Sequence, residues 1–150
     1  MWAVQRSSLR KVNPMLQLAS GSATLRLSLH VIAACIWLGG QLTLAGLLPT
    51  VRSLGEGAPK KVAQAFGRLS WPAYWVLIAT GFWNYAAVHG ETVTSSWNTA
   101  FAVKMLCVIV AGVGSYVHTV ATSPRLKGAS AGIGALATTA ALILGVALAG

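Results

Sequence analysis

Two side chains that can carry charge lie inside long apolar stretches of this 150-residue chain, and they are the first candidates for chemistry. His30 lies in the uncharged stretch 27–49, and Lys104 is the only charged residue of the stretch 98–121. An imidazole can bind a transition metal or transfer a proton, whereas an ammonium group can bind an anion or repel a cation. Ionisable groups are costly inside a membrane, so residues of this kind mark functional sites there.

The composition excludes several classes of protein. Apolar residues make up 55% of the chain and charged residues 9%, with 11 basic residues against 2 acidic ones, Glu56 and Glu91. A soluble enzyme that depends on paired carboxylates does not fit this balance, and intrinsic disorder does not fit such an apolar chain. The basic residues form short tracts between uncharged stretches. This arrangement is typical of membrane-flanking charge, and we expect no nucleic-acid partner.

The apolar stretches predict the fold. A membrane-spanning helix needs about 20 mainly apolar residues. Backbone groups in lipid must bond to each other, so each stretch of that length predicts a helix. We expect an all-α, integral membrane four-helix bundle with antiparallel, up-down helices, because the links between the later stretches are short. Its single domain covers 25–150 and follows a basic tail, 1–24, that is interfacial or disordered. The predicted spans are 27–49, 69–88, 98–121 and 129–149.

The same pattern predicts an orientation. Side A is the side that holds the N-terminus, the 89–97 loop and the C-terminus, and side B holds the loops 50–68 and 122–128. Side B carries six basic residues and side A four. Positive residues favour the cytoplasmic face, so loops 50–68 and 122–128 are expected in the cytoplasm of a multi-pass protein of the cell (inner) membrane. The basic residues are Arg52, Lys60, Lys61, Arg68, Arg125 and Lys127 on side B, and Arg6, Arg10, Lys11 and Arg26 on side A.

Helical spacing groups the candidate residues near side A. His30 shares a stripe with Trp37 and Gln41, and Lys104 shares one with Cys107. Both His30 and Lys104 lie a short way into helices that start on side A, where His89 and Glu91 also fall. A purely structural role stays open for each of these residues. The Lys104 side chain can extend to the membrane interface, and His30 can be a packing residue. Cys35 and Cys107 can be small apolar residues that fill space. His118 belongs to side B, and the fourth span reads as scaffold.

Three segments, in order, resemble the copper-resistance D (CopD) family of membrane proteins. Residues 29–40, LHVIAACIWLGG, resemble the start of that family's first helix. Residues 66–81 contain FGRLS and LIATG, similar to its second helix, and residues 101–106, FAVKML, are similar to its third. The resemblance covers about residues 25–121. It implies a membrane protein of copper transport, uptake or resistance.

On this resemblance the functional positions are His30 and Lys104. Copper is expected at His30 and His89 near side A, with Met105 and Cys107 as the sulfur groups of the third span. Lys104 would then be a charge gate or the partner of a bound anion, because a cationic lysine repels a copper ion. We expect a transporter or metal-binding membrane protein in preference to an enzyme. The lipid bilayer is the expected partner, with a homodimer or a larger membrane complex as further options.

A second resemblance is to HemJ-type protoporphyrinogen oxidases, which are four-helix membrane proteins that bind haem b. It depends on a histidine early in the first helix and a lysine early in the third. The resemblance implies a haem b-binding oxidoreductase in which His30, Lys104 and His89 contact the cofactor. A third option is an accessory membrane subunit with no site of its own. Three measurements distinguish these options. Haem absorption would indicate the oxidoreductase, bound copper the copper-handling protein, and co-purification with other proteins the accessory subunit.

Overall fold

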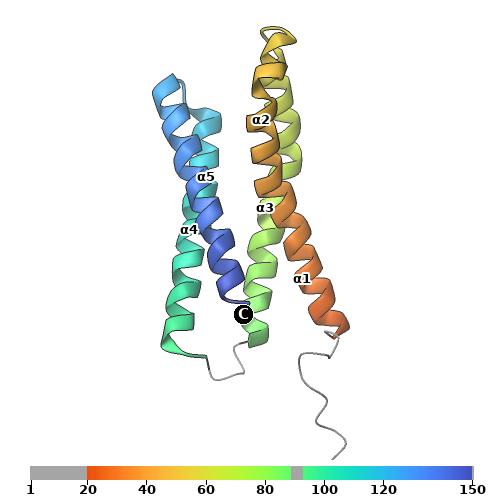
Figure 1. Ribbon diagram of the computed structural model, residues 1–150, viewed down its shortest axis with the longest axis vertical. Helices are drawn as coiled ribbons and strands as arrows, with labels where there is room; N and C mark the ends of the chain where they lie inside the picture. Colours follow the sequence, from red (N-terminus) through yellow and green to blue (C-terminus); the bar gives the residue numbers. More distant parts are fainter. Residues whose placement is uncertain (1–19, 89–92, 150) are drawn as a thin grey trace, which may run out of the picture.

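The computed structural model describes residues 20–88 and 93–149, and every element in these two ranges is helical (Figure 1). Three of these elements, α1, the π-helical turn η2 and α2, follow one another without a break and form one long helix. The described residues therefore fold as four antiparallel helices. The all-α prediction is therefore confirmed. The elements are α1 (Gly21–Ala34), η2 (Cys35–Gly39), α2 (Gly40–Ser53), α3 (Ala58–Val88), α4 (Ser95–Val120) and α5 (Pro124–Ala147).

Hydroxyl side chains fix where three of the helices begin. The Oγ atom of Ser20 accepts a hydrogen bond from the backbone N–H of Ala23 at 3.3 Å, ahead of α1. Thr94 and Ser123 cap α4 and α5 in the same way. Each cap satisfies one of the backbone donors that a helix start leaves unpaired. The starts of α1, α4 and α5 are thus set by local sequence, all at the ends of apolar stretches.

The connection predicted over 50–68 differs from the structure. Only residues 54–57 lie outside helix, and Gly55 makes the turn with φ of 120°. Helix propensity explains the difference, since the residues after the turn include alanine, lysine and glutamine, which favour helix in an aqueous setting as well as in lipid. The 33 residues of α1–α2 span about 50 Å, against about 36 Å for the 24 residues of α5. The α2–α3 turn therefore projects beyond the α4–α5 turn (Figure 1).

Within the described residues, three helices are long and apolar enough to cross a membrane, and they indicate a multi-pass membrane protein. They are Gly21–Ser53, Ser95–Val120 and Pro124–Ala147. Large apolar side chains also face outwards, among them Leu42 with 63% and Leu136 with 74% of its surface exposed. Such a surface suits lipid and would be a liability in water. The predicted span 69–88 lies within α3, where aromatic and polar side chains lower the hydropathy, and that span stays a prediction.

Small residues allow the helices to pack closely. A side-chain carbon at Gly114 of α4 would lie 2.9 Å from the carbonyl oxygen of Ser130 and 3.0 Å from the Cα of Gly134, both in α5. Gly40 of α2 leaves room for the ring of Phe66 in α3. In lipid such close approaches are a main source of helix association. They tie α4 to α5 and α2 to α3, which are the two hairpins that Figure 1 shows side by side.

The two hairpins meet at a buried aromatic cluster near mid-length. Trp37, which is 3% exposed, packs its ring 4.7 Å from that of Tyr74, and its indole N–H donates to Thr138 Oγ1 at 3.4 Å. The Tyr74 hydroxyl donates to the carbonyl of Val108 in α4 at 3.0 Å. Gly112 provides the space that this hydroxyl occupies. These contacts fix how α3 and η2 sit against α4 and α5.

The π-helical turn η2 carries Trp37 at its centre. A π turn adds one residue to a helix turn and changes which side chains face inwards, and such turns occur often at functional sites. Trp37 is buried whereas Cys35, two residues earlier, is exposed, so these two residues of η2 face differently. Gln41, on the next turn, is half-buried. Of the residues on the predicted inward stripe, Trp37 is buried, whereas His30 and Gln41 are half-buried.

Candidate functional site

His30 is held by one short hydrogen bond to α3. Its Nδ1 atom lies 2.7 Å from Thr80 Oγ1, and the Thr80 hydroxyl lies 2.6 Å from the carbonyl oxygen of Val76. A hydroxyl has one proton, and a carbonyl can only accept, so Thr80 donates to Val76. With the Thr80 hydroxyl donating to Val76, the His30 contact runs from Nδ1–H to Thr80. This assignment leaves Nε2 of the neutral imidazole with its lone pair available for a ligand.

The α3 surface beneath the ring is shaped to admit it. Thr80 and Gly81 are both buried, and a side-chain carbon at Gly81 would lie 3.8 Å from Cε1 of His30. An alanine would fit there in ordinary contact, whereas a larger side chain would meet the ring. The pair Thr80–Gly81 thus provides a hydrogen-bond acceptor and a flat contact surface at one level of α3.

Lys104 reaches the same level from α4. Both His30 and Lys104 lie nine residues after the first residue of their helices, or about 14 Å along each axis. A side-chain carbon at Gly145 of α5 would lie 3.2 Å from the Lys104 Nζ atom. Four helices therefore contribute to one level of the bundle, with His30, Thr80, Lys104 and Gly145.

The Lys104 side chain extends towards side A. Side chains of a helix lean towards its N-terminus, which for α4 is on side A. Gly145 lies three residues before Leu148, whose carbonyl accepts a hydrogen bond from the indole of Trp97 near the start of α4. The ammonium group is therefore closer to side A than the backbone of Lys104. This geometry supports the interpretation that Lys104 extends towards the interface, and it keeps the charge beside the His30 level.

Aromatic rings enclose the site on side A. Tyr85 of α3 stacks on Phe101 of α4 with ring centroids 4.5 Å apart, and Trp97 lies 5.8 Å from Phe101 and parallel to it. The Trp97 indole N–H also bonds the Leu148 carbonyl at 3.4 Å. The stack joins α3 to α4, and the hydrogen bond adds the end of α5. These contacts thus connect α3, α4 and α5 on the side A side of His30.

The other predicted site residues divide into three groups. Trp37 and Gln41 lie about two and three turns deeper than His30, and Met105 and Cys107 are half-buried in α4 beside Lys104. His89 and Glu91 lie outside the described residues. Within residues 20–88 and 93–149, no group of three or more histidine, cysteine, aspartate or glutamate side chains converges on one point. The described part of the site thus offers one imidazole nitrogen as a metal ligand.

His118 has a structural role that agrees with its place on side B. It is exposed, and its Nδ1–H donates to the carbonyl of Lys127 at 3.0 Å, which links the end of α4 to the start of α5. A haem with two histidine ligands does not fit the described residues, because His30 and His118 lie at opposite ends of the bundle. His30 alone remains at the level where a haem ligand was expected.

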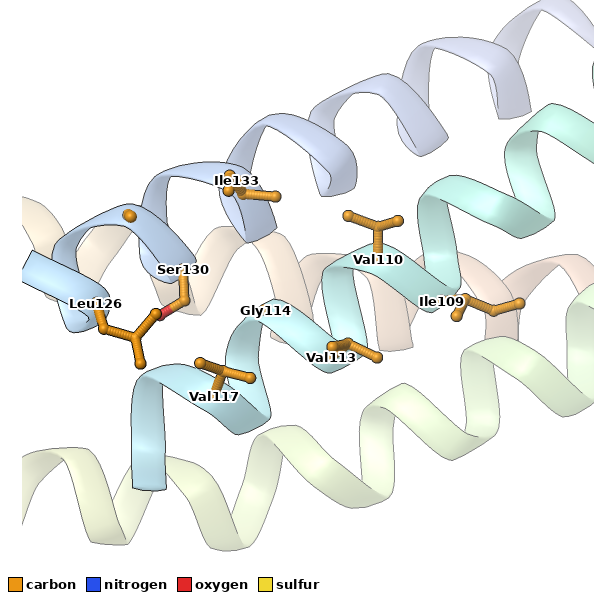
Figure 2. Close-up of a pocket in the computed structure, with 9 residues that line it drawn as sticks. Ile109, Val110, Val113, Gly114, Val117, Leu126, Ser130 and Ile133 are labelled. Atoms are coloured by element: carbon orange, nitrogen blue, oxygen red, sulfur yellow. The ribbon is translucent and has the colours of Figure 1, made fainter. Parts of the chain in front are cut away.

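A separate groove of about 330 Å³ runs between α4 and α5, nearer side B (Figure 2). Ser130 is its one polar side chain, and the Ser130 hydroxyl donates to the Lys127 carbonyl at 3.2 Å. No ionisable side chain lines the groove, so its interior offers no means of binding a charged ligand. The lining residues are Ile109, Val110, Val113, Gly114, Val117, Leu126, Ala129, Ser130 and Ile133.

Three partner residues were not predicted as part of the site. Thr80 lies in the segment LIATG, which resembles the second helix of the CopD family. That position in the motif is the one sequence feature that could have indicated a role for Thr80. Thr138 was read as scaffold, yet its hydroxyl donates to the Gly134 carbonyl and accepts the Trp37 indole. Gly145, beside Lys104, carries no signal in the sequence because its role depends on how α4 and α5 pack.

Replacing Thr80 by valine is expected to change the tautomer of His30. Valine keeps the shape but has no oxygen to accept the Nδ1–H, and a hydrogen bond of this kind contributes about 1 kcal/mol, or about a fivefold ratio of tautomers. Nitrogen-15 NMR of the labelled imidazole measures the ratio directly. Thr80→Ser is the matched control and should keep the Nδ1–H form. An unchanged tautomer in Thr80→Val would contradict the assignment.

Comparison of the chain with models of known protein families, with curated proteins and with solved structures finds no match. The interpretation of the site therefore depends on its own geometry. Three features define it: the oriented imidazole of His30, the hydroxyl of Thr80, and the ammonium of Lys104. Together they could bind a soft or borderline metal ion, an anion, or both.

Proposed function

We propose that the protein is a copper-handling membrane protein that receives a copper ion at His30. The supporting observation is the hydrogen bond from His30 Nδ1–H to Thr80, which holds the ring and leaves Nε2 available. Histidines that bind metals are usually oriented in this way, with the second ring nitrogen bonded to a neighbouring oxygen. Imidazole is a suitable ligand for copper. The resemblance of residues 29–40 to the CopD first helix supports the same metal.

The sparse ligand set favours passage of the ion over storage. A transported ion must bind well enough to enter a site and weakly enough to leave it. One oriented imidazole, with the sulfur groups of Met105 and Cys107 on the neighbouring helix, meets this requirement better than a closed cage would. Lys104 opposes a second positive charge at the same level, and so acts as a charge gate. We propose a role in copper uptake or tolerance.

The proposed setting is the cell (inner) membrane, with the α2–α3 and α4–α5 turns in the cytoplasm. Arg52, Lys60 and Lys61 flank the projecting α2–α3 turn, Arg68 lies about three turns into α3, and all four are exposed. Arg125 and Lys127 flank the other turn on the same side. Positive charge on this side favours its retention in the cytoplasm. His30 then lies nearer the outer face, where an incoming ion arrives.

Titration of the purified full chain with Cu(I) tests the proposal. In detergent, and in competition with a coloured chelator, we expect one Cu(I) per chain. An absorption spectrum of protein expressed with ample haem is recorded on the same preparation. A Soret band together with no copper binding would support the haem alternative, and a lack of both would leave only the accessory-subunit interpretation. Either result rules out copper handling at His30.

A further inference from the structure

The groove between α4 and α5 is confined to the side B half of these two helices. Val117 and Leu126 line one end of it, and Ile109 lines the other (Figure 2). From Ile109 to Val117 in α4, and from Leu126 to Ile133 in α5, it runs about 10–12 Å along the helix axes. One leaflet is half of the hydrocarbon thickness, or about 15 Å. The groove therefore fits within a single leaflet.

The side B end of the groove lies at the edge of the hydrocarbon. The 26 residues of α4 and the 24 residues of α5 span about 39 Å and about 36 Å. Against about 30 Å of hydrocarbon, helices of this length extend about 3–5 Å beyond it at each end. Val117 lies about 4–5 Å before the end of α4 at Val120, and Leu126 lies about 3 Å after the start of α5 at Pro124. The groove therefore opens at the level where hydrocarbon gives way to headgroups.

Two basic residues flank this opening. Arg125 and Lys127 are the chain neighbours of Leu126, and both are exposed. On a helix they lie on opposite flanks of Leu126, and helix side chains lean towards the N-terminus, which for α5 is on side B. The Lys127 carbonyl accepts hydrogen bonds from His118 Nδ1–H at 3.0 Å and from the Ser130 hydroxyl at 3.2 Å, which fixes this turn against α4. Positive charge is thus placed at headgroup level beside an apolar groove.

We propose that the groove binds one acyl chain of an anionic phospholipid from the side B leaflet, with its phosphate held by Arg125 and Lys127. The apolar interior suits the hydrocarbon chain, and the two basic residues complement the charge of the headgroup. Basic pockets between membrane helices bind anionic headgroups in this way, through charge-assisted hydrogen bonds to the phosphate oxygens. Any acyl chain is as apolar as the next, so the headgroup decides which lipid is selected.

The extent of the groove favours a lipid over a second copy of the chain. A helix from a second copy would pack along much of the 24 residues of α5, or about 36 Å. The groove covers about a third of that length and stops within one leaflet. A single acyl chain that enters from the side B headgroups matches this extent. The proposal does not depend on copper binding at His30.

Lipid binding is measured on the full chain in a neutral detergent, without copper. Native mass spectrometry follows a titration with phosphatidylglycerol in one arm and with phosphatidylcholine in the other. The two lipids carry the same acyl chains, so the difference in affinity reports the headgroup. We expect the first phosphatidylglycerol to bind about thirtyfold more tightly than the first phosphatidylcholine, because two basic residues attract its negative charge.

The double variant Arg125→Gln/Lys127→Gln is expected to remove this preference and to leave phosphatidylcholine binding unchanged. It should fold, since the N-terminal end of a helix favours negative charge and does not need the two cations. The matched control is Lys60→Gln/Lys61→Gln, which removes two exposed cations beside the α2–α3 turn on the same side. The control should keep the wild-type preference.

Ala129→Leu tests the groove itself while the charges stay in place. Ala129 lines the groove and is exposed, so the larger side chain takes up space that the acyl chain would occupy. Phosphatidylglycerol affinity should fall about tenfold or more. The matched control is Ala131→Leu, which adds the same side chain at an exposed position of α5 outside the groove lining. This control should bind phosphatidylglycerol as the wild type does.

Three results would overturn the lipid site. The wild type could bind both lipids equally, or Arg125→Gln/Lys127→Gln could keep the preference. The control Lys60→Gln/Lys61→Gln could lose as much preference as the site variant, as general attraction by surface charge would require. Alternatively, the wild type could be a dimer that Ala129→Leu converts to a monomer with no change in lipid affinity, as a second copy in the groove would require. The Cu(I) titration depends on none of these results, so the two proposals fail separately.

Discussion

His30→Ala is expected to lower the Cu(I) affinity of the purified protein by at least about a hundredfold. Loss of a partner that merely orients a metal-binding histidine costs about 10–100-fold, so loss of the ligand itself costs more. His30 supplies the one imidazole at its level within the described residues, and its Nε2 is the atom left available by Thr80. The chelator competition that measures the wild type measures this variant, and cellular copper accumulation should fall with it.

The control for this variant is His118→Ala. His118 is also a histidine near a helix end, but its Nδ1–H bonds the Lys127 carbonyl on side B. Its removal should leave the Cu(I) affinity unchanged, although the junction of α4 and α5 loses one hydrogen bond. Equal copper affinity in the wild type and in His30→Ala would refute the proposed copper site, as would an equal loss in both histidine variants.

The level shared by His30 and Lys104 could be predicted from sequence because it depends on helix geometry alone. Each residue lies the same number of residues after a capped helix start, and antiparallel helices that begin on one side place such residues at one depth. Hydropathy located the helices, although the predicted spans begin three to six residues after the observed starts of α1, α4 and α5 at Gly21, Ser95 and Pro124. The order of the helices and their alternating direction followed from the short links.

The partner of His30 could not be predicted in the same way. Whether Thr80 faces α1 depends on the rotation of α3 about its own axis, which packing of Ala73, Tyr74 and Gly81 decides. The π-helical turn at Cys35–Gly39 also lacks a local signal. It adds one residue to a helix turn, which rotates the residues that follow it by about 100°. Tertiary contacts, which sequence periodicity does not contain, determine both features.

The helical extension of α2 and α3 shows a related limit. Basic residues ended the predicted span at residue 49, because hydropathy measures the preference for lipid. Helix formation has no such requirement, and alanine, lysine and glutamine continue a helix into water. The membrane boundary and the helix boundary are therefore separate properties of this chain. They differ by more than two turns at the start of α3, where Ala58 begins the helix and Leu69 begins the predicted span.

Gly114→Ala is expected to destabilise the α4–α5 hairpin. It should also disturb the level of the bundle that holds His30 and Lys104. The new methyl group would lie 2.9–3.1 Å from backbone atoms of Ser130 and Gly134, which cannot move aside as a flexible side chain can. The two helices must separate, and overpacking of this kind costs about 1–3 kcal/mol. Thermal unfolding in detergent, followed by circular dichroism, should show a melting temperature lower by several degrees.

The matched control is Gly132→Ala, on the same hairpin. A methyl group there would meet nothing within 4 Å, so the substitution adds no contact and removes a flexible glycine from a helix. Its melting temperature should equal or exceed that of the wild type. If Gly114→Ala were as stable as Gly132→Ala, the close approach of α4 and α5 would be wrong. The position of Lys104 against Gly145 would then be in doubt, because the same helix pair sets it.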